Sequence, residues 1–274
     1  HGYIYTALLA SGLLDALLDK GYRYAMTANS DNLGAAPSAR IAGWFAASGA
    51  PYAPEMCRRT PADVKGGHLA VRKSDGRIIL RDTAQTPEDQ MHYFTDQFRH
   101  PFFHTNNLWF DLKVLRETLV ERGGILGLPL IRNSKTVDPA DSSSTPVIQL
   151  ETAMGAAVEA FEGATAIEVP RSRFLPVKTT NDLLLVRSDV YEVDDDGLLR
   201  MVPERACTVN LDPRFYKKIQ DFEARFPNGV PSIKDAQSLT VEGDWTFGSG
   251  VVATGEAHVE AGGSPGRIAD GTRI

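Results

Sequence analysis

A cluster of polar side chains follows a predicted strand near the start of the chain. The pattern from Tyr24 to Ala28 predicts a short buried strand, which stops at Asn29, Ser30, Asp31 and Asn32. In open α/β sheets, ligands bind beyond the carboxyl ends of the strands, so a polar loop at this point is a candidate binding site. The carboxylate of Asp31 is a hard oxygen ligand of the kind that divalent cations take. The alternative is that Asp31 forms a turn that caps the next helix.

A second pattern has the spacing of a metal site. His92, Asp96, His100 and His104 are each four residues apart, which stacks ligands on one face of a helix, as in some zinc sites. Pro101 lacks the backbone donor that a helix needs and ends the helix before His104. We therefore do not expect a zinc site here.

The elements around these residues alternate between helix and strand. Leucines at helical spacing from Tyr5 to Leu18 predict one amphipathic helix, and Pro37 to Ala47 predicts a second. The alternating segment from His68 to Arg81 surrounds an Asp-Gly pair, which is a strong signal for a hairpin turn. Three further helices are predicted at residues 87–98, 112–122 and 152–161. This order predicts an α/β fold.

The texture changes after about residue 230. Short β-forming pieces between glycines recur from residue 239 to residue 260, and evenly spaced rungs of this kind predict a small β-solenoid. A flat two-layer β tail is the alternative. We therefore expect a domain at residues 1–230 and a β-solenoid domain at residues 231–274. Because a solenoid leaves its ends open, we also expect a homo-oligomer through this tail.

Composition excludes several classes of protein. The chain has 274 residues and a net charge of −6, whereas proteins that bind nucleic acid or anionic membranes usually carry a basic face. No apolar run approaches the roughly 20 residues that span a bilayer. With no leader sequence and only Cys57 and Cys207, a disulfide framework is not expected, and a reducing cytoplasm fits best.

Several strings taken together are more specific than composition. They resemble the eukaryotic-type UTP–glucose-1-phosphate uridylyltransferase family, also called UDP-glucose pyrophosphorylase, in the same order along nearly the whole chain. The strings are His1-Gly2, Asn29-Ser-Asp-Asn-Leu-Gly34, Ala62-Asp-Val-Lys-Gly-Gly67, Thr105-Asn-Asn-Leu-Trp109, Gln149-Leu-Glu-Thr152, Pro170-Arg-Ser-Arg-Phe-Leu-Pro-Val-Lys178 and Asp244-Trp-Thr-Phe-Gly248. The resemblance implies a partial Rossmann-like nucleotidyltransferase (GT-A-like) domain with a small C-terminal β-solenoid of the left-handed β-helix type.

The resemblance also implies a reaction. In this family a phosphate oxygen of glucose 1-phosphate attacks the α-phosphorus of UTP in line, which forms UDP-glucose and releases pyrophosphate. Members carry a glycine-rich phosphate loop and most of the uracil-recognition residues before the region that matches here. Neither G-x-G-x-x-G nor a P-loop occurs in this chain. Since the chain begins at His1, we expect that its nucleotide-binding part is missing.

Two charged residues take catalytic roles by this resemblance. Asp31 lies where the family pattern places a ligand of Mg²⁺, and Lys178 lies where it places a lysine on the phosphates. Pro176 and Val177 precede that lysine and restrict its backbone. Without the resemblance, a lone lysine at the end of a strand would be interpreted as a solvated side chain.

The other site residues are also assigned by the resemblance. Asp82 and Asn106 would hydrogen-bond the sugar hydroxyls, and Gly67 would let the backbone approach the sugar. Asn29, His1 and Gly2 would contact the nucleotide and the sugar phosphate. The alternative for Asp82 is an ion pair with Arg81 or Lys73.

The role of two arginines has two alternative interpretations. Arg171 and Arg173 would clamp a phosphate, since a guanidinium matches two phosphate oxygens at once. Equally, they would pair with Glu151 and Glu168.

The chain departs from the family pattern at two positions. Tyr3 stands where an Asp commonly follows His-Gly, and His104 stands where an Asn often precedes Thr-Asn-Asn. Two other functions also stay open: an N-acetylhexosamine 1-phosphate uridylyltransferase, and a non-catalytic fragment that binds a sugar phosphate.

Overall fold

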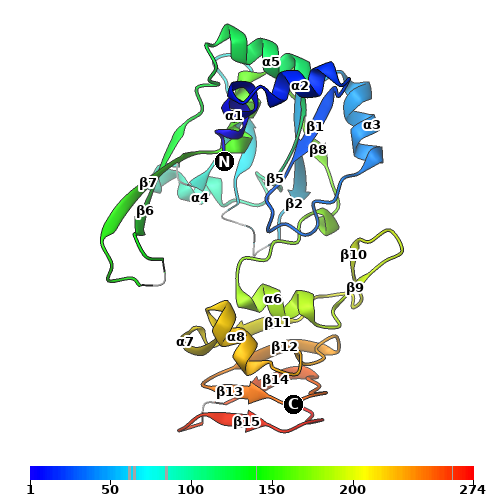
Figure 1. Cartoon of the computed structure of the whole chain (residues 1–274), viewed down its shortest axis with the longest axis vertical. Coiled ribbons are helices and arrows are strands. Elements are labelled where there is room, and N and C mark those ends of the chain that lie inside the picture. Colours follow the sequence, from blue (N-terminus) through cyan, green and yellow to red (C-terminus); the bar gives the residue numbers. More distant parts are fainter. Residues whose placement is uncertain (61–62, 64–65, 84–85, 140, 261) are drawn as a thin grey trace. The chain divides into compact units, whose positions relative to one another are not determined.

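The computed structural model describes residues 1–60, 63, 66–83, 86–139, 141–260 and 262–274. Ala62, Val64 and Lys65 of the Ala62–Gly67 string lie outside the described residues. The chain divides into two compact units, which Figure 1 shows as ribbons. Unit 1 comprises residues 1–29 and 37–173, and unit 2 comprises residues 30–36 and 174–274. No helix among the described residues is long and apolar enough to cross a bilayer.

A mixed four-stranded sheet forms the centre of unit 1. Its order is β1-β5-β2-β8, with β5 antiparallel to both β1 and β2, and β8 parallel to β2. The strands are β1 (Tyr24–Thr27), β2 (Tyr52–Arg58), β5 (Phe102–Asp111) and β8 (Ile167–Glu168). The predicted strand at residues 24–28 is thus confirmed. The α/β class holds, but this sheet is mixed and not the parallel sheet that a Rossmann-like fold would give.

Helices cover both faces of this sheet. Side chains alternate between the faces of a strand, and Tyr52, Leu108 and Phe110 pack in one apolar cluster with α1, α2 and α5, while Ala53 and Trp109 pack in another with α3. The helices are α1 (Ile4–Ala10), α2 (Leu13–Asp19), α3 (Ala39–Ser48) and α5 (Leu112–Glu121). In Figure 1, α1, α2 and α5 lie together, and α3 lies apart from them.

Two hairpins and several short helices complete unit 1. The predicted hairpin is present as β3 (His68–Val71) and β4 (Ile78–Arg81), with Gly76 in the left-handed region at φ 72°. A second hairpin was not predicted, and its strands are β6 (Leu130–Thr136) and β7 (Pro146–Thr152). The short helices are η3 (Glu88–Gln90), α4 (Met91–Phe94), η4 (Met154–Ala160) and η5 (Arg171–Arg173).

Three helix predictions differ from the structure. The segment predicted as a helix at residues 87–98 forms only η3 and α4, and α4 ends at Phe94. The helix predicted from Tyr5 to Leu18 is divided into α1 and α2, because Gly12 takes a left-handed conformation at φ 74°. The segment predicted as a helix at residues 152–161 begins inside β7 and continues as the 3₁₀ helix η4.

Unit 2 packs short helices on short strands. Leu184, Tyr216 and Phe222, from α6, α7 and α8, share one apolar core with Leu239 and Phe247 of the strands. The helices are α6 (Thr180–Arg187), α7 (Pro213–Tyr216) and α8 (Ile219–Arg225). The strands are β9 (Tyr191–Val193), β10 (Leu199–Met201), β11 (Thr208–Leu211), β12 (Ala236–Val241), β13 (Trp245–Phe247), β14 (Gly255–Val259) and β15 (Gly266–Ile268).

The predicted β-solenoid is wrong. The strands pair in a parallel three-stranded sheet, β11-β12-β14, and a separate parallel pair, β13-β15, and no closed or solenoid sheet is found among the described residues. Glycines with positive φ, such as Gly243 and Gly250, do separate the short strands, but turn spacing alone does not fix which strands pair. The expected left-handed β-helix and the homo-oligomer that depended on it therefore lose their basis.

The compact units also differ in extent from the predicted domains. The strand β11 lies before residue 231 and pairs with β12 after it, and unit 2 begins again at residue 174. A domain boundary at residues 230 and 231 stays a prediction.

Candidate functional site

The two residues with predicted catalytic roles form an ion pair in unit 2. The Nζ atom of Lys178 lies 2.8 Å from Oδ2 of Asp31, although the two residues are 147 positions apart in the chain. The side chain of Lys178 is 59% exposed and that of Asp31 is 34% exposed. An exposed ion pair of this kind contributes about 0–1 kcal/mol, so stability alone is a weak reason for it.

Backbone hydrogen bonds bring this pair together. The N–H of Val177 donates to the carbonyl of Asp31 at 2.8 Å, and the N–H of Leu33 donates to the carbonyl of Leu175 at 3.0 Å. The side chain of Asn32 also accepts from the N–H of Leu175, at 2.7 Å. The segment that carries Asp31 is therefore paired with the segment that carries Lys178.

The second oxygen of the Asp31 carboxylate differs from the first in having no partner. Its Oδ1 atom is buried and has no hydrogen-bond partner, and a buried polar atom without a partner is uncommon in proteins. The capping alternative for Asp31 is wrong, because Ser38 caps α3 by accepting from the N–H of Ile41 at 3.3 Å. The geometry fits an oxygen ligand for a cation.

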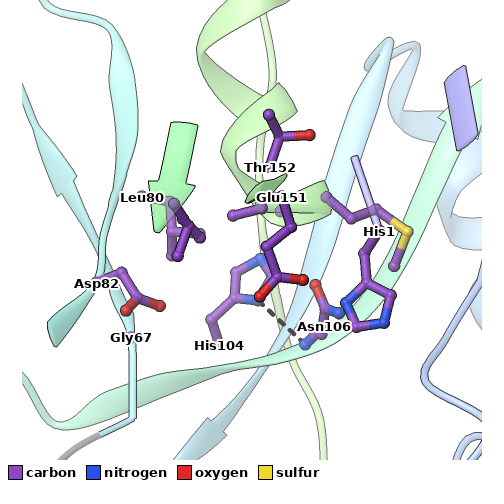
Figure 2. A pocket seen from close by; sticks show the side chains of 12 residues that line it. His1, Gly67, Leu80, Asp82, His104, Asn106, Glu151 and Thr152 are labelled. Carbon is purple, nitrogen blue, oxygen red and sulfur yellow. Dashed lines mark hydrogen bonds between the residues drawn. The ribbon is translucent and has the colours of Figure 1, made fainter. Parts of the chain in front are cut away.

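A pocket in unit 1 collects most of the predicted sugar-binding residues. Its volume is about 190 Å³, and Figure 2 shows the side chains that line it. The lining residues are His1, Gly67, Leu80, Asp82, His104, Asn106, Ile131, Glu151, Thr152, Ala153, Met154 and Gly155. Sites for drug-sized ligands measure about 300–1,000 Å³, so this pocket suits a small polar molecule such as one sugar ring.

Asn106 and Asn29 lie together in unit 1. The Nδ2 atom of Asn106 donates to Oδ1 of Asn29 at 2.7 Å. Asn106 has φ 64° and is the one non-glycine residue with a positive φ in the part of the chain that the structure describes. Asn106, which is predicted to contact the sugar, is thus held against Asn29, which is predicted to contact the nucleotide or the sugar phosphate.

The glycines near the pocket are closely surrounded. A Cβ atom added to Gly67 would lie 3.1 Å from the carbonyl of Arg81 and 3.4 Å from Oδ2 of Asp82. One added to Gly2 would lie 2.3 Å from Oγ1 of Thr152. The N–H of Gly2 donates to the carbonyl of Thr152 at 2.8 Å, which holds the start of the chain at the pocket.

The two arginines have partners other than those considered from the sequence. Arg171 forms a two-pronged ion pair with Asp63, at 2.6 and 3.1 Å, and Arg173 pairs with the fully buried Glu55 at 2.7 Å. The side chain of Arg173 is only 12% exposed, which makes it a structural residue. The ligand-binding role of Arg171 stays a prediction.

Glu55 is a buried hydrogen-bond centre that the sequence did not reveal. Its carboxylate accepts from Nε1 of Trp109 at 2.8 Å, from Nδ2 of Asn107 at 3.0 Å and from Nε of Arg173 at 2.9 Å. Its carbonyl accepts from the hydroxyl of Thr105 at 2.8 Å. These bonds fix the residues on both sides of Asn106.

The histidines of the zinc-like spacing have separate surroundings. His92 packs against Tyr93, His100 stacks on His68 at 3.8 Å between ring centres, and His104 lines the pocket. Among the described residues, no three His, Cys, Asp or Glu side chains are grouped so that they could hold a metal ion.

Apart from Arg171, the structure thus places the predicted residues in two groups, one in each unit. His1, Gly67, Asp82 and Asn106 line the pocket, with Asn29 bonded to Asn106 and Gly2 beside it. Sequence reasoning did not assign Glu151, Thr152 or His104 to the pocket. Glu151 and Thr152 belong to the Gln149–Thr152 string, so the resemblance could have indicated these two residues.

Comparison with known proteins gives a consistent result. A family model described as UTP–glucose-1-phosphate uridylyltransferase matches residues 1–253. A protein of that name from Solanum tuberosum is 43% identical over 265 residues, which are 95% of this chain and 53% of that protein. One from Saccharomyces cerevisiae is 40% identical over 93% of this chain and 50% of its own length. The chain therefore spans about half the length of the curated relatives it matches.

Solved structures agree with this match. A UDP-glucose phosphorylase from Trypanosoma brucei is 43% identical, with a TM-score of 0.88 over 100% of this chain and 59% of its own. A variant of UDP-glucose pyrophosphorylase from Leishmania major, in complex with UDP-glucose, is 46% identical, with a TM-score of 0.85 over 100% of this chain and 60% of its own. The likeness supports an α/β nucleotidyltransferase-like fold with mixed sheets.

Proposed function

Since this chain belongs to the UTP–glucose-1-phosphate uridylyltransferase family, we propose that it provides the sugar-phosphate side of an enzyme that forms UDP-glucose and pyrophosphate from UTP and glucose 1-phosphate. The observation that carries this proposal is the ion pair of Asp31 and Lys178, in which the second carboxylate oxygen is buried without a partner. The family supplies the class of reaction, and the pair supplies the two kinds of group that this reaction needs.

The main task of the protein in this reaction is to bring two polyanions together. A phosphate oxygen of glucose 1-phosphate attacks the α-phosphorus of UTP, pyrophosphate leaves, and no covalent enzyme intermediate is needed. Catalysis then rests on positioning and on offsetting the negative charge. Because its exposed ion pair with Asp31 contributes little stability, Lys178 can move its ammonium group to a phosphate oxygen at low cost. We assign Lys178 to the attacking phosphate.

The residues also fit a magnesium ion. Mg²⁺ is usually held by one or two carboxylates together with waters and substrate phosphates, and not by a cage of protein groups. Asp31 offers one such oxygen, its buried Oδ1, and no larger cluster of ligands is found among the described residues. When bound, the ion would offset the negative charge of the phosphates. Asp31 is the residue that we propose to hold it.

The pocket of unit 1 is proposed to hold the glucose ring. Its wall carries carboxylates from Asp82 and Glu151 and an amide from Asn106, and such groups accept hydrogen bonds from hydroxyls. Gly67 lets the chain pass close to Asp82. A sugar ring needs this mixture of acceptors and donors more than it needs charge.

The test compares glucose 1-phosphate with glucose as ligands of this chain. Calorimetric titration should show that Lys178→Ala weakens glucose 1-phosphate binding by about tenfold to a hundredfold, because one charged partner of the phosphate is lost. Binding of glucose, which has no phosphate, should not change. Lys217→Ala is the matched control, since Lys217 is also exposed in unit 2. In an enzyme that turns over both substrates, Lys178→Ala should lower UDP-glucose formation by about a hundredfold.

Three results would change the proposal. Equal loss of glucose and glucose 1-phosphate binding would remove Lys178 from the phosphate. Tighter binding of an N-acetylhexosamine 1-phosphate would favour the related uridylyltransferase. If glucose 1-phosphate binds but no UDP-glucose forms from UTP when the nucleotide-binding part is present, the chain is a non-catalytic binding protein.

A cytoplasmic location is part of the proposal. Cys57 and Cys207 are both free and buried, and thiols stay reduced in that compartment.

A further inference from the structure

Asn106 has an unusual backbone at the pocket. Its φ of 64° lies in the left-handed region, where a residue with a side chain is at a steric disadvantage. On β5, residues 105–107 stand opposite Glu55 alone, because Leu108 pairs with Pro54 and His104 pairs with Met56. The chain bulges here, so the N–H of Asn106 needs a partner outside the usual strand pairing.

His104 provides that partner. The N–H of Asn106 donates to Nδ1 of His104 at 3.0 Å, and Figure 2 shows this bond in the pocket. Since Nδ1 accepts, the proton of the neutral imidazole is on Nε2. Burial lowers the pKa of His104 to about 4, so Nδ1 is able to accept at neutral pH.

The imidazole of His104 is itself fixed in place. The backbone N–H of His104 donates to the carbonyl of Gly67 at 2.7 Å, which holds the main chain at this residue. The ring packs against Gly155, where an added Cβ would lie 2.5 Å from Cε1 and 2.8 Å from Nε2 of the ring. A ring held in this way gives Nδ1 a single position.

The bond has a consequence for the side chain of Asn106. With the backbone held at positive φ, the Nδ2 atom reaches Oδ1 of Asn29 at 2.7 Å, and the amide lines the pocket. If the N–H were released, Asn106 would relax toward the commoner negative φ, and its amide would point elsewhere.

We propose that His104 is a positioning residue for the sugar: through the bond from the Asn106 N–H to Nδ1 it holds the Asn106 amide in the binding pocket. The inference rests on the proposed function for the identity of the ligand, and on the bulge of β5 for the geometry. His104 acts through Asn106 and is not required to touch the sugar.

Two substitutions distinguish the effect of the hydrogen-bond acceptor of His104 from the effect of its ring. His104→Phe keeps a ring of similar shape and removes the acceptor, whereas His104→Asn removes the ring and keeps an oxygen that can accept from the N–H two residues later, as in an Asx turn. His104→Ala, which adds no bulk beside Gly155, is a second variant without the acceptor.

The experiment measures the hydrogen bond of the Asn106 N–H and the binding of the ligand separately. Amide hydrogen exchange by nuclear magnetic resonance, without ligand, should show faster exchange at the Asn106 N–H in His104→Phe and His104→Ala and near-native exchange in His104→Asn. Titration with glucose 1-phosphate should show about tenfold weaker binding for the first two variants and binding within about threefold of native for the third. Thermal unfolding identifies any variant that does not fold.

The outcomes distinguish the two proposals. Native binding by folded His104→Phe and His104→Ala would overturn the positioning role, as would unchanged exchange at Asn106. Equal weakening in all three variants would overturn it as well, because the ring and not the acceptor would then matter. If the native chain bound no glucose 1-phosphate, the proposed function would fail, whereas the exchange data would still decide whether His104 holds Asn106.

Discussion

The substitution Glu55→Gln tests whether a buried charge organises the strands beside the pocket. Glu55 is fully buried, and its partner Arg173 has a side chain that is 12% exposed. Glutamine keeps the shape but removes the negative charge, and its amide presents N–H groups to the donors of Trp109, Asn107 and Arg173. An N–H donor of the new amide then faces an N–H donor of one of these three residues, and the guanidinium of Arg173 is left without its anion.

The expected loss is large for a change that conserves shape. Removing one partner of a buried ion pair costs about 3–5 kcal/mol. For a unit of this size, 1 kcal/mol corresponds to about 2–4 °C in the unfolding midpoint, so Glu55→Gln should lower the midpoint by about 6–20 °C. Urea unfolding followed by circular dichroism would give the free energy directly.

Glu168→Gln is the matched control. Glu168 also pairs with an arginine, Arg58, at 2.9 Å, but the two side chains are 51% and 68% exposed. An exposed pair contributes about 0–1 kcal/mol, so Glu168→Gln should have little effect. If the two substitutions lowered the unfolding free energy equally, or if Glu55→Gln cost less than about 1 kcal/mol, the reasoning from burial would be refuted.

Three further outcomes are expected. Burial lowers the pKa of His68 to about 3 and that of His104 to about 4, whereas both histidines titrate near 6.5 in the unfolded chain. Between the folded and unfolded pKa values, the unfolded chain therefore binds more protons than the folded chain. The unfolding free energy should accordingly fall by about 2 kcal/mol per histidine from pH 7.5 to 5. Urea unfolding across this range would check it, and a flat profile would contradict it. Gly155→Ala should weaken glucose 1-phosphate binding in a titration, because the new Cβ would lie 2.5 Å from the His104 ring; native binding would mean that the ring can move. Asp31→Asn should abolish the line broadening that Mn²⁺, as a probe for Mg²⁺, causes at residues near position 31, and unchanged broadening would place the metal elsewhere.

Local sequence signals predicted the elements that depend on neighbouring residues. The Asp75-Gly76 turn fixed its hairpin, and α5 begins and ends close to its predicted bounds. Gly12 was not recognised as the point that divides the first helix, because leucines at helical spacing occur on both sides of it. The solenoid prediction failed because evenly spaced glycines mark turns but do not specify which strands pair.

The candidate site was predictable by resemblance and not by local chemistry. Asp31 and Lys178 are far apart in the chain, so no spacing pattern could show that they lie 2.8 Å from each other. The bonds of Arg171 to Asp63 and of Arg173 to Glu55 are equally remote. A glutamate within a strand suggests a solvent-facing side chain, and only the fold shows that Glu55 is enclosed.

The distance between Asp31 and Lys178 is set by main-chain hydrogen bonds at residues 31–33 and 175–177. Loops anywhere between these two short segments can therefore lengthen or shorten without moving the pair. A slip of one residue within either segment is different, because it would turn one of the two charges to the opposite face of the chain. Homologues should accordingly vary in loop length between these segments while keeping the length of each segment constant.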